Sequence, residues 1–171
     1  MNSLVELARN RILSLSQPLD CDQNAVAKLK NETPAEFFPH ARNAPAAHAA
    51  LLLLFGAWDD SHNLIDDDET SEGEYVHAIA HRIEPDSGNS AYWFRRVGKH
   101  AIFPEMRERA QQILSNVPVA EWQLKSEWDP FLFNEWCEEA RRAPGSEKER
   151  AALAIQQAEL NLLFDYCAGL P

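Results

Sequence analysis

Four side chains that can bind metals or exchange protons lie close together in the sequence, at positions i, i+3, i+7 and i+10. They are Glu74, His77, His81 and Glu84. In a helix each residue turns by about 100°, so the four side chains would fall within about 80° of one face. Two imidazoles and two carboxylates on one stripe are suited to binding a divalent metal or to acid–base chemistry near neutral pH.

The metal hypothesis takes His77, His81 and Glu84 as ligands. Imidazoles four residues apart on a helix can share one ion, and a carboxylate can complete or orient the set. The spacing is not that of HExxH, so no known zinc-hydrolase motif supports it. Structural roles remain open: Glu74 fits a capping box that begins at Ser71, Glu84 can pair with a neighbouring arginine, and the histidines can be a solvated face.

Two further histidines precede this stretch. His48 and His62 fall on the two preceding predicted helices, and antiparallel packing could bring either of them toward His77 and His81. His48 stands between two alanines, a setting that is more typical of a buried core histidine than of a ligand.

Polar and aromatic residues also crowd the turn and helix that follow. Arg82 could clamp an acidic ligand, whereas Asp86 and Asn89 have ordinary explanations as capping residues. Tyr92 and Trp93 favour packing inside a helical hairpin.

The run from His77 to Gly98 resembles an uncharacterised family of microbial proteins with the pattern H-x3-H-R-x-E-x-D-x2-N-x2-Y-W-[FY]-R-x-x-G. The earlier Asp60-Ser61-His62 is similar to a D-x-[SA]-H element of the same family. The resemblance covers about residues 46–100 and implies kinship and a candidate site but no reaction. The implied site residues are His62, His77, His81, Arg82, Glu84, Asp86 and Asn89.

Helix signals dominate the chain and predict an all-α fold, a helical array or bundle of about 7–9 helices. We expect one domain over residues 1–171, with the motif-bearing part at 44–100. Apolar spacing predicts a first helix from Leu4 to Leu15, and the nearly continuous apolar run at 51–55 predicts a buried central helix. Capping boxes are expected at Thr33, Ser71 and Ser146.

Two segments resemble each other at a spacing of 29 residues, since 56–64 can be laid over 85–93. Each segment follows an apolar helix and opens another. This arrangement is similar to a degenerate tetratricopeptide or Sel1-like hairpin, although the period is shorter than the usual 34 residues.

Composition restricts the possible partners. The net charge of −11 and the absence of a large basic patch argue against nucleic acid and against an anionic membrane. The longest apolar stretch is too short to span a bilayer, and the first residues lack the apolar core of a secretory signal. The three cysteines are far apart, which favours unpaired thiols. We therefore expect a cytoplasmic protein.

Two hypotheses about function follow. The leading one is a helical binding module that holds a small polar ligand or a protein segment against His77, His81, Arg82 and Glu84. The alternative is a metal-dependent or acid–base enzyme that uses His77, His81 and Glu84, with a divalent metal as a possible cofactor. Convergence of three or more of these groups would favour the enzyme.

Overall fold

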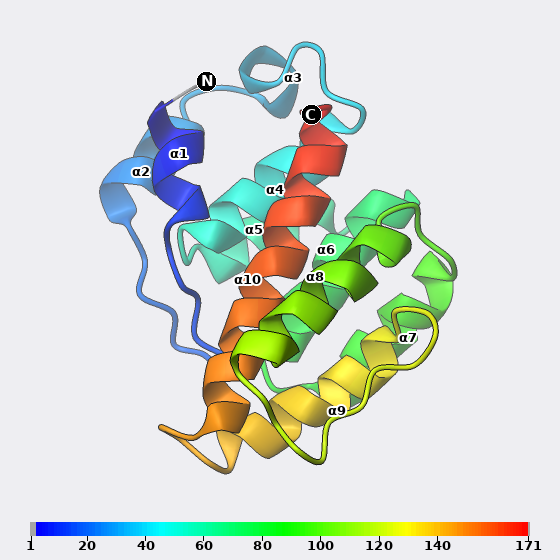
Figure 1. Ribbon diagram of the computed structural model, residues 1–171. Coiled ribbons are helices and arrows are strands. Elements are labelled where there is room, and N and C mark those ends of the chain that lie inside the picture. The colour runs from blue at the N-terminus through cyan, green and yellow to red at the C-terminus, as the bar shows by residue number, and fades with distance from the viewer. Residues whose placement is uncertain (1–2, 171) are drawn as a thin grey trace.

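The computed structural model describes residues 3–170 and folds them into ten α-helices, with no strand in this range (Figure 1). The predicted all-α fold is confirmed. In chain order the helices are α1 (Ser3–Arg9), α2 (Gln23–Leu29), α3 (Pro34–Phe37), α4 (Ala44–Leu54), α5 (Trp58–Ile65), α6 (Ser71–Ile83), α7 (Ser87–Val97), α8 (Phe103–Asn116), α9 (Pro130–Arg141) and α10 (Glu147–Ala168).

Helices α4, α6 and α10 form the centre of the molecule. Every residue of α4 from Ala46 to Leu54 is buried, as its continuous apolar sequence predicts. Helix α10 is the longest, and it contacts α4, α6, α8 and α9 along its length (Figure 1). No helix among residues 3–170 is both long enough and apolar enough to cross a membrane.

Helix α6 is buried along almost its entire length, from Gly73 to Ile83. The expected capping box at Ser71 is wrong, because Thr70 is the N-cap and its hydroxyl accepts from the amide of Gly73 at 3.1 Å. Glu74 is thereby free to accept a hydrogen bond from Arg96 Nε at 2.6 Å. A solvated histidine face on this helix is also excluded by its burial.

The N-terminal segment packs onto the helical core. Helix α1 ends at Arg9, so the expected helix to Leu15 is too long. The chain continues irregularly, yet Leu13 and Leu15 are buried. A backbone hydrogen bond attaches this irregular segment to the end of α6: the amide of Gln17 donates to the carbonyl of Ile83 at 3.1 Å.

A glycine allows this segment to cross the end of α4. Gly56 has a φ of +80°, and a Cβ there would lie 2.4 Å from the carbonyl oxygen of Asp20. Beside it, the amide of Asp22 donates to the carbonyl of Phe55 at 2.9 Å. Any side chain at Gly56 would therefore collide with backbone that has no room to move.

The same hydrogen bond closes two successive helix pairs, α4–α5 and α6–α7. Ser61 Oγ donates to the carbonyl of Ala49 at 2.8 Å, and Ser90 Oγ donates to the carbonyl of Ala78 at 2.7 Å. Both the serines and the alanines are separated by 29 residues, the spacing seen in the sequence. The two pairs thus have equivalent positions that can be compared residue by residue.

A buried ion pair joins α6 to α10. Arg82 and Glu159 are both fully buried, and Arg82 Nη1 donates to Glu159 Oε2 at 2.5 Å. Arg82 Nε also donates to Asn134 at 2.7 Å, and the Tyr75 hydroxyl donates to Glu159 at 2.8 Å. The guanidinium lies over the ring of Phe133, 4.5 Å from its centroid. Arg82 is therefore a structural residue rather than a surface ligand clamp.

Replacing Arg82 by methionine should lower the free energy of unfolding by about 3–5 kcal/mol, because the charge of Glu159 would stay buried without its partner. Urea unfolding followed by circular dichroism measures the loss. The matched control is Arg109→Met, whose exposed pair with Glu105 should contribute about 1 kcal/mol or less. Equal losses in the two variants would contradict the structural role of the buried pair.

Candidate metal centre

Three histidine nitrogens converge between α5 and α6. His77 Nε2 lies 2.8 Å from His62 Nε2, and His81 Nε2 lies 3.3 Å from His62 Nε2. One ligand atom from each residue falls within 4.8 Å of the others. Tetrahedral zinc with bonds of 2.0–2.1 Å requires nitrogens separated by about 3.3 Å. The two distances to His62 lie at or somewhat below this separation, so the three imidazoles are close enough to serve as ligands of a single ion.

Helix geometry accounts for this convergence. His77 and His81 are one turn apart, and their rings stack with centroids 5.0 Å apart at 15°. His62 approaches from α5 with its ring nearly perpendicular to both, at 84° and 86°. A perpendicular third ring directs its nitrogen toward the other two without a steric clash.

Two tryptophans hold the imidazole rings in place. The indole of Trp58 stacks on His62 with centroids 4.8 Å apart, and its Nε1 donates to the carbonyl of Ala80 at 2.7 Å. On the other side, Trp93 stacks on His77 at 3.9 Å and 14°. Because ring orientation fixes the direction of the nitrogen lone pair, these contacts preorganise the cluster.

Glu84 fixes the tautomer of His81. Its Oε2 lies 2.8 Å from His81 Nδ1, which donates this hydrogen bond when it carries the proton. The proton on Nδ1 leaves the Nε2 lone pair free to face the cluster, which is the arrangement that carboxylates commonly impose on metal-binding histidines. The amide Nδ2 of Asn89 lies 3.1 Å from His81 Nε2, beside the cluster.

Two imidazoles of the cluster, His62 and His77, have lowered pKa values. Burial lowers the pKa of His77 to about 3, and repulsion from His62 and His81 adds to this effect. The pKa of His62 is also lowered, mainly by burial and then by His81, although Asp66 and nearby acids oppose the shift. Deprotonated imidazoles are the form that binds a metal, so His62 and His77 should meet little proton competition at neutral pH.

The structure separates the predicted site residues into two groups. His62, His77, His81, Glu84 and Asn89 lie together, with Glu84 hydrogen-bonded to His81 instead of lying among the converging nitrogens. The remaining candidates lie elsewhere: Arg82 in the buried ion pair, Asp86 as the N-cap of α7, and His48 against Phe37 and Phe38.

The helix-pair repeat shows which residues are peculiar to the site. At a spacing of 29, His81 corresponds to the buried Leu52, and Trp93 corresponds to Leu64. The α4–α5 pair thus packs with leucines where α6–α7 carries a histidine and a tryptophan. This comparison is the sequence signal that distinguishes Trp93 from an ordinary packing residue of the hairpin, whereas no pattern in the sequence marks Trp58.

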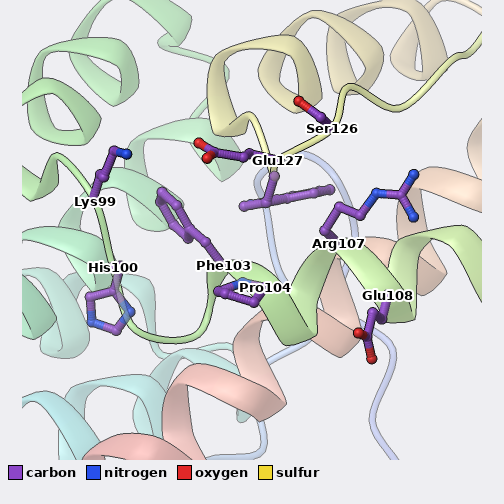
Figure 2. A pocket seen from close by; sticks show the side chains of 9 residues that line it. Lys99, His100, Phe103, Pro104, Arg107, Glu108, Ser126 and Glu127 are labelled. Atoms are coloured by element: carbon purple, nitrogen blue, oxygen red, sulfur yellow. The ribbon is translucent and has the colours of Figure 1, made fainter.

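A separate hollow of about 410 Å³ lies beside α8, and none of the predicted site residues lines it (Figure 2). Phe103 and Trp128 line it, and its charged residues balance, with Lys99 and Arg107 against Glu108 and Glu127. This hollow contains one histidine, His100, and no cluster of metal-binding groups.

No protein-family model matches the chain, and no curated protein or solved structure is significantly similar to it. The candidate site therefore rests on its own geometry.

Metal-free protein should lose stability between pH 8 and pH 5, and His77 should account for about 1–2 kcal/mol of the loss. The unfolded imidazole takes a proton below a pKa of about 6.5, whereas the folded one, with its pKa lowered to about 3, stays neutral. Because the neighbouring His62 is partly exposed, solvent screens part of this difference between the folded and unfolded pKa values. Urea unfolding at both pH values, with EDTA present, measures it.

The variant His77→Gln cannot titrate at this position and is the comparison. Its stability should fall less than that of the wild type over the same pH range. An identical fall in both proteins would show that His77 is not held neutral by the fold.

Proposed function

We propose that this protein is a metalloprotein that binds one divalent transition metal through His62, His77 and His81, and that it is a metal-dependent enzyme. The observation that carries the proposal is the convergence of the three Nε2 atoms, with His62 at 2.8 and 3.3 Å from the other two. A metal bound in this way acts as a Lewis acid and can activate water for hydrolysis.

Three imidazole ligands favour a transition metal of intermediate softness. Imidazole suits zinc, copper, nickel and iron, whereas magnesium and calcium prefer oxygen donors. Thiolates do not compete, because Cys137 and Cys167 are buried and their pKa values are raised by burial. Zinc is the ion we expect, since three histidines with one further position are a known catalytic zinc arrangement.

The geometry favours the enzyme hypothesis over the binding module. The binding module requires Arg82 to lie on one accessible surface with His77, His81 and Glu84. The Arg82 side chain is instead buried against Glu159. The metal hypothesis needed three converging groups, and the cluster supplies them with His62 in the place expected for Glu84. Glu84 supports the same centre by orienting His81.

Untagged protein purified without chelators should contain close to one equivalent of zinc or a similar metal by elemental analysis. The variant His81→Leu should contain almost none while keeping its fold, because leucine occupies the equivalent position in α4–α5. Circular dichroism and thermal unfolding check the fold.

The matched control is His40→Ala, which removes an exposed histidine outside the cluster. It should retain the full metal content. Protein that stays metal-free after incubation with zinc, or metal that persists in His81→Leu, would overturn the proposal.

A further inference from the structure

The candidate centre has three protein ligands, and a fourth is missing among residues 3–170. The group of converging metal-binding side chains in this range consists of His62, His77 and His81 alone. Glu84 already contacts His81 on Nδ1, the nitrogen that points away from the cluster. Structural zinc sites are closed by four protein ligands, whereas catalytic sites keep one position for water or substrate.

The cluster also reaches the surface. His77 and His81 are buried, but His62 is only partly buried, as are Trp58, Asn89 and Trp93 around it. The amide Nδ2 of Asn89 lies 3.1 Å from His81 Nε2, at this partly exposed side. This partly exposed side, the mouth of the centre, is where a small ligand would approach.

Acidic residues surround this mouth. Asp59, Asp66 and Glu84 are all exposed: Asp59 and Asp66 lie three residues before and four residues after His62, along α5 and at its C-cap, and Glu84 contacts His81. Of the nearby cations, Arg82 is buried against Glu159, and Arg96, which lies 5.4 Å from the ring centroid of Trp93, is neutralised by its ion pair with Glu74. Three carboxylates more than offset the two positive charges that a divalent ion would bring.

We propose that the fourth coordination position of this centre is open and accepts small neutral or cationic ligands in preference to anions. The proposal rests on the proposed function, since it needs the metal to be bound. It directs the search for substrates away from phosphate esters and other anions and toward uncharged or amine-containing molecules. Like charges at a mouth of this kind lower both the concentration and the affinity of an incoming anion.

The test uses protein loaded with cobalt(II), whose visible spectrum reports ligand exchange that zinc hides. Metal content is measured first, so a failure of metal binding is recognised separately. Imidazole and azide are then titrated as the neutral and the anionic probe. Both should change the spectrum if the position is open, and metal analysis after gel filtration checks that neither probe has removed the ion.

The deciding variant is Asp59→Asn/Asp66→Asn, which removes two rim charges and leaves Glu84 in place on His81. Azide affinity should rise about threefold to tenfold, while imidazole affinity should change less than about twofold. The rise should shrink at high salt, because the interaction is screened. The control Glu108→Gln/Glu135→Gln makes the same change in net charge on α8 and α9, and azide affinity should not respond.

Two results would overturn the inference. A cobalt spectrum that neither probe alters would mean that the position is closed, by Asn89 or by the surrounding tryptophans. Equal azide affinities in the wild type and in Asp59→Asn/Asp66→Asn would mean that the rim charges do not select the ligand. Neither result would affect the metal stoichiometry on which the proposed function depends.

Discussion

The burial of α6 is the constraint on which the rest of the structure depends. This helix carries histidines, an arginine and a glutamate, yet its residues from Gly73 to Ile83 are all removed from solvent. Buried polar groups need hydrogen-bond partners, so the neighbouring helices must provide those partners. Helix α10 supplies Glu159 to Arg82, and α5 brings His62 to the two histidines.

The two sides of α6 use its polar residues differently. On one side, Arg82 and Glu159 neutralise each other inside a cage of aromatic rings, and nothing remains for a ligand. On the other side, one ring nitrogen from each of three imidazoles lies within 4.8 Å of the other two. The proposed metal would bind at this group of nitrogens.

The 29-residue repeat shows how such a site can arise on a helical hairpin. The serine-to-carbonyl bond and the packing of α4–α5 recur in α6–α7, so the hairpin folds with either set of side chains. Leu52 and Leu64 fill the positions that His81 and Trp93 occupy in the second pair. His81 and Trp93 therefore replace leucines of a common scaffold, whereas His77 has His48 at its equivalent position. The loss of His81 should accordingly be tolerated by the fold.

The sequence by itself determined the all-α fold, the buried α4, and the helix on which His77 and His81 share a face, because periodicity and capping are local properties. It also marked His62 and Glu84 as members of a candidate site. Only the tertiary structure decided their roles, since the angle between α5 and α6 places His62 among the nitrogens and leaves Glu84 on Nδ1 of His81. The inward direction of Arg82 was likewise decided by a partner 77 residues away, which no local pattern encodes.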